Sequence, residues 1–193
     1  MKLDDCLKNT SNQPGISINF LDFIVTLPPR DMGEQRLAFE NKIVSPDEFP
    51  DRLAGLPRPL VFTNGCFDVL HRGHVTLLAQ ARALGAALVV ALNSDASVKR
   101  LGKGDDRPVN GLADRLALIA ALAAVDLVTW FDEDTPLARI RECRPEVLVK
   151  GGDWPVDKIV GYRQVSDWGG RVYSVPFVHQ TSTTALLEKI RRL

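Results

Sequence analysis

The sequence of 193 residues contains little sulfur. Its three cysteines, Cys6, Cys66 and Cys143, are odd in number, far apart in the chain and never arranged as CxxC. This pattern fits neither a disulfide framework nor a zinc knuckle. Because free thiols persist in reducing compartments, we expect a protein of the cytoplasm.

An excess of positive charge is also missing, since 24 basic side chains are balanced by 24 acidic ones. This balance argues against bulk binding of nucleic acid, which usually leaves a basic excess. The most apolar early run, residues 16–27, contains Asn19 and Asp22 and is too short to cross a membrane. No basic segment or cleavage site typical of a secretory signal surrounds it. We therefore expect neither a nucleic-acid nor a membrane partner.

Two common phosphate-binding motifs are absent. The chain contains neither GxxxxGKS nor GxxxxGKT, and the turn after its first predicted strand lacks GxGxxG. The first absence excludes a Walker-type phosphate loop, and the second disfavours a dinucleotide-dependent dehydrogenase. Any phosphate site in this chain must therefore be built in another way.

The first 40 residues differ in composition from the rest. They include "NTSNQPG" and "LPPRDMGEQR", which are typical of turns and linkers. We expect residues 1–40 to form a weakly ordered or irregular N-terminal extension and residues 41–193 to form one domain. Because Met32 is the only methionine besides Met1, translation starting at Met32 is an alternative hypothesis for this segment.

From residue 43 onward, short apolar runs alternate with segments of helical periodicity. This alternation predicts a single Rossmann-like, doubly wound α/β domain with a mostly parallel sheet of five strands. A polar loop is expected at 93–110. The expected strands are 59–64, 86–92, 126–131, 146–151 and 171–177. One short helix is expected to start at residue 45, and further helices are expected at 73–84, 111–125, 135–143, 157–168 and 182–193.

In such a sheet the ligand lies beyond the carboxyl ends of the strands. The first of these ends leads into "TNGCFDVLHRGH", residues 63–74, at the predicted start of a helix. Free amides at a helix N-terminus favour an anion, Gly73 leaves the backbone accessible, and His71 and His74 can donate to one point. Residue spacing alone leaves three alternatives open, which are a phosphate site, a metal site and no site at all.

Cations follow the other strand ends. Lys99, Arg100, Lys103 and Arg107 lie in the predicted loop, and Arg115 lies on the next helix. A solvated charged loop is the commoner fate of such a run, and a surface ion pair with Asp114 is an alternative for Arg115.

Polar groups also follow the fourth and fifth strands. Lys150 precedes two glycines and Asp153, where a plain turn is the alternative to a ligand contact. Thr181, Ser182 and Thr183 precede the last helix, where simple capping would require only one of them.

Together these elements resemble the cytidylyltransferase-like nucleotidyltransferases. "HRGH" is similar to their HxGH signature, and "TSTT" is similar to their second phosphate motif. The segments "VALNSDASVKRL", "RPVN", "DLVTWFDEDTP" and "LVKGGDW" narrow the resemblance to the heptose 1-phosphate adenylyltransferases in their stand-alone form. The resemblance covers residues 42–193. The sequence differs from the family pattern at "KRLGKG", where Gly102 resembles an inserted residue.

The resemblance implies an enzyme that transfers AMP from ATP to D-glycero-β-D-manno-heptose 1-phosphate for lipopolysaccharide core or other surface-glycan heptose. The products would be ADP-heptose and pyrophosphate. Two alternatives are a cytidylyltransferase acting on glycerol 3-phosphate or another alcohol phosphate, and a nucleotide-binding sensor without activity.

The resemblance also implies roles for particular residues. Mg²⁺ would arrive with ATP and without a predicted set of protein ligands, and a homodimer is a further expectation. His71, His74, Lys103 and Arg115 would be catalytic, and Lys99 would face the acceptor. Asp68 would either face the acceptor or hold a loop. Nucleotide binding would fall to Thr63, Asn64, Gly65, Cys66, Phe67, Gly73, Asn93, Lys150, Gly151, Asp153, Thr181, Ser182 and Thr183.

Overall fold

The computed structural model describes residues 37–102, 104, 106–179 and 181–193. The expected N-terminal extension, apart from residues 37–40, lies outside the described residues, and so does Met32. Lys103 lies outside them as well, so the role expected for it stays a prediction. No helix in the described part of the chain is both long enough and apolar enough to span a membrane.

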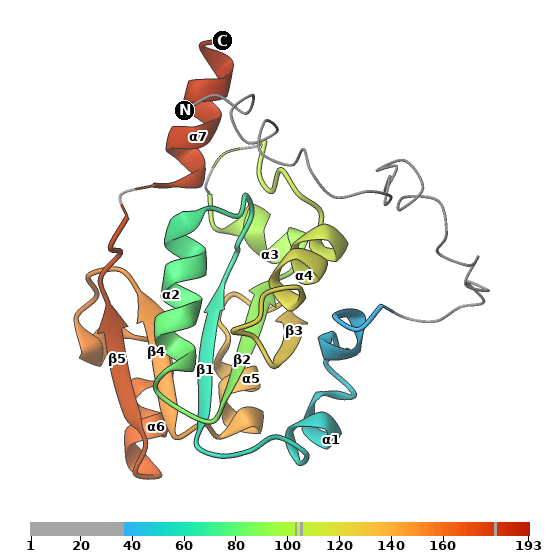
Figure 1. The fold of residues 1–193 in the computed structure, drawn as a ribbon. Coiled ribbons are helices and arrows are strands. Elements are labelled where there is room, and N and C mark those ends of the chain that lie inside the picture. Colours follow the sequence, from blue (N-terminus) through green and yellow to red (C-terminus); the bar gives the residue numbers. More distant parts are fainter. Residues whose placement is uncertain (1–36, 103, 105, 180) are drawn as a thin grey trace, which may run out of the picture. The chain divides into compact units, whose positions relative to one another are not determined.

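Five parallel strands form one sheet with the order β3-β2-β1-β4-β5. This arrangement confirms the predicted Rossmann-like fold class (Figure 1). Each strand is an apolar run because the sheet is covered on both faces. The strands span Leu60–Gly65 (β1), Ala87–Asn93 (β2), Leu127–Phe131 (β3), Val147–Gly151 (β4) and Arg171–Val175 (β5).

Helices cover the two faces of the sheet in two buried clusters. On one face, α2 (Arg72–Arg82) and α4 (Leu112–Ala120) contribute side chains such as Leu78 and Ile119 to the core. On the other face, α1 (Phe49–Leu53), α5 (Leu137–Cys143) and α6 (Tyr162–Asp167) contribute Phe49, Ile140 and Val165. The last helix, α7 (Thr183–Arg191), comes after β5 in the chain (Figure 1).

The expectation of an uninterrupted loop at 93–110 is wrong, because helix α3 spans Asp95–Arg100. The hydroxyl of Ser94 accepts a hydrogen bond from the Ser97 amide (3.0 Å) and caps the helix. Asp95 lies in the first turn and Lys99 and Arg100 lie in the last, so the charges complement the helix dipole. Without the Ser94 cap, the charges of Lys99 and Arg100 favour a solvated loop.

Two other helices also differ from expectation. Ser45 and Glu48 form the reciprocal hydrogen bonds expected of a helix start, yet the regular helix begins only at Phe49. The helix expected at 157–168 is split into a 3₁₀ turn, η3 (Val156–Lys158), and α6. The break occurs at Gly161, whose φ of +93° is unfavourable for any residue with a Cβ.

Gly161→Ala should lower stability more than Gly169→Ala, although both glycines have positive φ. A Cβ on Gly161 would lie 2.8 Å from Ile140 Cδ1, whereas a Cβ on Gly169 would meet nothing within 4 Å. We expect a cost of about 1–2 kcal/mol for the backbone in both variants and about 1–3 kcal/mol more for overpacking at Gly161. Urea denaturation measures the difference, and equal costs would contradict the packing described for this turn.

Candidate active site

The strand order reverses at β1, which is therefore the switch point of the sheet. β2 and β3 lie on one side of β1, and β4 and β5 lie on the other. A crevice at the carboxyl ends of such strands is the usual ligand site of the fold. A cavity of about 360 Å³ lies there. It is lined by Asn64, Gly65, Cys66, Asn93, Leu101, Asp134, Thr135, Pro136, Lys150, Trp154, Lys158, Ile159 and Val160.

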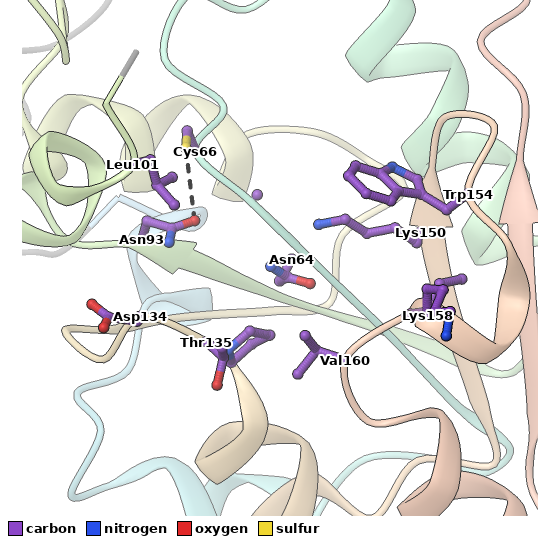
Figure 2. A pocket seen from close by; sticks show the side chains of 13 residues that line it. Asn64, Cys66, Asn93, Leu101, Asp134, Thr135, Lys150, Trp154, Lys158 and Val160 are labelled. Carbon is purple, nitrogen blue, oxygen red and sulfur yellow. Dashed lines mark hydrogen bonds between the residues drawn. The ribbon is translucent and has the colours of Figure 1, made fainter. Parts of the chain in front are cut away.

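Three polar side chains stand at the ends of three adjacent strands and face this cavity. Asn93 is the last residue of β2, and Asn64 and Lys150 are the last but one of β1 and β4 (Figure 2). The Asn93 amide donates to the hydroxyl of Ser97 (3.0 Å), and its oxygen lies 3.7 Å from the thiol of Cys66. Figure 2 shows Lys150 extending toward Asn64 across the cavity. The cavity therefore combines amide groups and a cation at fixed strand ends.

The two histidines of the HxGH segment lie together at the start of α2. Their rings are stacked, with centroids 3.7 Å apart and an angle of 22° between the planes. The ring of Phe67, whose φ is +47°, packs edge-on against His74 at 5.2 Å. The backbone amide of His74 donates to the carbonyl of His71 (2.9 Å). The turn therefore fixes both imidazoles at one helix N-terminus.

The immediate surroundings of His71 favour its neutral form. Burial lowers the pKa of its imidazole below the usual 6.5, so the ring is mostly uncharged at pH 7. Its Nδ1 atom is buried and has no hydrogen-bond partner among the described residues. A neutral imidazole keeps one N–H donor, which suits a hydrogen bond to a phosphate oxygen.

The hydroxyl-rich turn before α7 lies next to the histidine turn. Thr183 Oγ1 is 3.5 Å from the carbonyl oxygen of Val69, and a Cβ built on Gly73 would lie 3.4 Å from the carbonyl oxygen of His179. Ser182 caps the helix by accepting from the amide of Ala185 (3.1 Å). The two segments, about 110 residues apart in sequence, thus place two helix N-termini side by side.

The surroundings of Arg115 favour a role other than the catalytic one expected for it. Its side chain is fully buried, and its guanidinium donates to the carbonyl oxygens of Cys66 (2.7 Å), Asn93 (2.8 Å) and Asn110 (3.0 Å). It also pairs with Asp95 at 2.7 Å, not with Asp114. All these partners belong to the protein. We infer that Arg115 positions the ends of β1 and β2 and does not itself contact phosphate.

Asp68 is likewise occupied by the protein. Its buried carboxylate pairs with Arg107 and accepts from the amides of Val109 (2.8 Å) and Asn110 (2.9 Å). The Asn110 side chain also donates to the Asp68 carbonyl (2.7 Å). Of the two roles expected for Asp68, this geometry favours holding the loop over a contact with the acceptor.

The remaining predicted residues divide into two groups. Asn64, Gly65, Cys66, Asn93 and Lys150 line the cavity. Thr63, Phe67, Gly73, Gly151, Asp153, Thr181, Ser182 and Thr183 are not part of that lining, and Lys99 is exposed on α3.

Sequence reasoning missed several lining residues. They are Leu101, Asp134, Thr135, Pro136, Trp154, Lys158, Ile159 and Val160. Trp154 lies in "KGGDW", and Asp134–Pro136 lie in "DEDTP". Both segments contribute to the family resemblance, and this was the signal in the sequence that could have identified these residues.

A parallel sheet with two helix N-termini at its switch-point edge defines a nucleotide-binding α/β protein. The model of the cytidylyltransferase-like family matches residues 62–189. The chain therefore belongs to the cytidylyltransferase-like family.

Individual relatives agree with this assignment. The chain is 58% identical over 156 residues to a "D-beta-D-heptose 1-phosphate adenylyltransferase" of Bordetella bronchiseptica, covering 80% of this chain and 96% of that protein. It is 53% identical to the "Bifunctional protein HldE" of Hahella chejuensis over 69% of this chain but only 28% of that protein.

Solved structures show the same fold. A lipopolysaccharide core biosynthesis protein from Thermoplasma volcanium matches with a TM-score of 0.53 and 28% identity, over 66% of this chain and 100% of that chain. A pantoate-beta-alanine ligase from Francisella tularensis, at 14% identity over 78% of each chain and a TM-score of 0.52, shares the fold alone.

Arg115→Gln should destabilise the domain by about 3 kcal/mol, because buried carbonyl oxygens lose their donors and Asp95 loses its partner. Arg163→Gln, a matched change on the exposed surface of α6, should stay within about 0.5 kcal/mol of the wild type. Urea denaturation of both variants measures these costs. A stable Arg115→Gln variant that lacks only turnover would contradict the positioning role.

Proposed function

We propose that the chain transfers AMP from ATP to D-glycero-β-D-manno-heptose 1-phosphate and releases pyrophosphate. The observation that carries this proposal is the 58% identity to the Bordetella bronchiseptica adenylyltransferase over 96% of that protein. The histidine turn and the hydroxyl turn, which lie next to each other, and the cavity at the carboxyl ends of the strands support the proposal. ADP-heptose, the product, would supply heptose for lipopolysaccharide core or another surface glycan.

In this reaction an oxygen of the sugar phosphate attacks the α-phosphorus of ATP. A new P–O bond forms there, the bond from the α-phosphorus to the bridging oxygen breaks, and pyrophosphate leaves with that oxygen. A phosphate monoester has a second pKa of about 6, so the attacking group is already largely dianionic at neutral pH. The step therefore needs positioning and charge stabilisation instead of a general base.

The residues of the two turns would hold the triphosphate. His71 and His74 would donate to the α-phosphate as negative charge builds on it, and the neutral state favoured for His71 provides an N–H donor. Ser182 and Thr183, with the free amides of α7, would bind the outer phosphates. Lys103 is the cation expected to neutralise the leaving group, and Lys99 is expected to face the acceptor.

ATP would enter as its magnesium complex. The described residues contain no group of three or more His, Cys, Asp or Glu side chains placed to hold a metal ion. Mg²⁺ commonly binds through substrate phosphates and water with few protein ligands. We therefore treat Mg²⁺ as part of the nucleotide substrate.

The acceptor would bind on the side of the cavity formed by Asn93 and Thr135. Asn93, which the sequence predicted to bind the nucleotide, would instead offer its amide group, and Thr135 its hydroxyl, to the hydroxyl groups of the sugar. We expect the reaction to take place in the cytoplasm, where ATP is available and free cysteines stay reduced. A homodimer is our further expectation, and size-exclusion chromatography with light scattering tests it.

A pyrophosphate-release assay tests the proposed function by crossing ATP and CTP with a panel of acceptors. The panel contains heptose 1-phosphate, mannose 1-phosphate and glycerol 3-phosphate. We expect the highest kcat/KM with ATP and the heptose. Preference for CTP with glycerol 3-phosphate would support a cytidylyltransferase instead, and no release with any pair would favour a nucleotide sensor.

His74→Ala should lower kcat by about two to three orders of magnitude, the usual effect of removing one preorganised donor. Gln80→Ala, an exposed change farther along α2, is the matched control and should leave kcat unchanged. Circular dichroism would establish that both variants fold. Turnover near the wild-type level in His74→Ala would contradict the role given to this histidine.

A further inference from the structure

Trp154 is the most unusual residue of the cavity lining. Its exposed fraction is 54%, although an indole is among the side chains that gain most from burial. It lies at the cavity edge next to Lys150 (Figure 2). An exposed aromatic surface beside a cavity is typical of a ligand contact.

The backbone under Trp154 is held firmly. Its amide donates to the hydroxyl of Ser174 on β5 (2.9 Å), and that hydroxyl donates to the carbonyl of Gly152 (2.5 Å). The amide of Gly152 donates in turn to the carbonyl of Val175 (2.9 Å). These bonds tie the turn after β4 to the neighbouring strand. The backbone that carries the indole is therefore fixed by hydrogen bonds to β5.

The glycines before Trp154 are needed for this placement. Gly152 has a φ of +108°, and a Cβ built on it would lie 3.0 Å from Nε1 of Trp154. A side chain there would strain the backbone and push against the ring. The sequence "KGGDW" thus places a flat ring directly over bare backbone.

The turn that carries Trp154 also packs against α2, the helix that begins at the two histidines. A Cβ on Gly151 would lie 2.5 Å from Leu77 Cδ2 and 2.9 Å from Phe177, so this turn touches α2 one helical turn after His74. The next glycine contacts Trp154 and Phe177. A nucleotide whose phosphates lie at the start of α2 would therefore extend its base toward the indole.

We propose that Trp154 is a specificity-determining residue that stacks on the adenine ring of ATP. This inference rests on the proposed function, in which ATP is the only substrate with a flat aromatic ring. Stacking of a base on an aromatic side chain contributes about 1–3 kcal/mol, which corresponds to about a 5- to 150-fold change in Kd. The sugar phosphate would bind on the side of the cavity formed by Asn93 and Thr135.

Isothermal titration calorimetry of the full chain tests the stacking with four ligands, which are ATP, CTP, inorganic tripolyphosphate and heptose 1-phosphate, each with Mg²⁺. Trp154→Ala should weaken ATP binding about 5- to 150-fold, and Trp154→Phe should restore most of the affinity because it keeps an aromatic face. Tripolyphosphate has no base, so its affinity should be the same in all variants. Trp168→Phe is the control, since its indole donates to the carbonyl of Pro145 and lies outside the cavity lining.

Three results would overturn the inference. They are unchanged ATP affinity in Trp154→Ala, an equal loss of tripolyphosphate affinity, and a loss confined to the sugar phosphate. The last result would mean that the indole contacts the acceptor. If the wild type binds CTP in place of ATP, the proposed function fails, while the effect of Trp154→Ala on CTP still decides whether a base is stacked. A wild type that binds neither nucleotide overturns both.

Discussion

The buried guanidinium of Arg115 is the interaction on which the site depends. It joins the carbonyl at Cys66 after β1 to the carbonyl at Asn93 at the end of β2, and it pairs with Asp95 at the start of α3. Through Asn110 it is connected to Asp68 and the loop that Asp68 holds. Strand ends have unsatisfied carbonyl groups, and a planar cation with five donors can satisfy several of them at once. The cavity floor is therefore fixed before any ligand arrives.

This constraint gives the histidine turn and the turn before α7 a rigid base. Phe67 follows the clamped carbonyl directly, and its ring supports His74 from the side. The turn before α7 then comes alongside the same segment at Val69. The proposed chemistry requires only that donors and cations surround one phosphorus atom, because the attacking phosphate carries its own negative charge at neutral pH. Imidazoles, hydroxyl groups and helix N-termini would supply the donors, and the expected lysines of the neighbouring loop would supply the positive charge.

Much of the fold could be predicted from the sequence, because buried parallel strands are continuous apolar runs. Runs such as residues 86–92 correspond within one residue to the observed strand, Ala87–Asn93. Helix α3 was missed because Lys99 and Arg100 suggest a solvated loop unless the Ser94 cap is recognised. The pairing of phosphate motifs was predictable because parallel strands bring their carboxyl ends to one edge.

The parts of the site that depend on tertiary structure could not be predicted in this way. Nothing local in the sequence indicates that Arg115 is buried, since its four partners come from three other segments. An arginine on a helix is ordinarily expected at the surface. The exposure of Trp154 is equally hidden, because an isolated tryptophan in a sequence predicts core. Both assignments require the three-dimensional arrangement of the strand ends.

The central claim is that the histidine turn and the hydroxyl turn hold one triphosphate. A crystal structure of the chain with a nonhydrolysable ATP analogue and Mg²⁺ measures this directly. The account predicts phosphate oxygens at hydrogen-bond distance, about 2.7–3.2 Å, from an imidazole nitrogen of His71 or His74 and from Ser182 or Thr183 in the same nucleotide. A triphosphate that contacts only one of these turns, or that binds at another edge of the sheet, would contradict it.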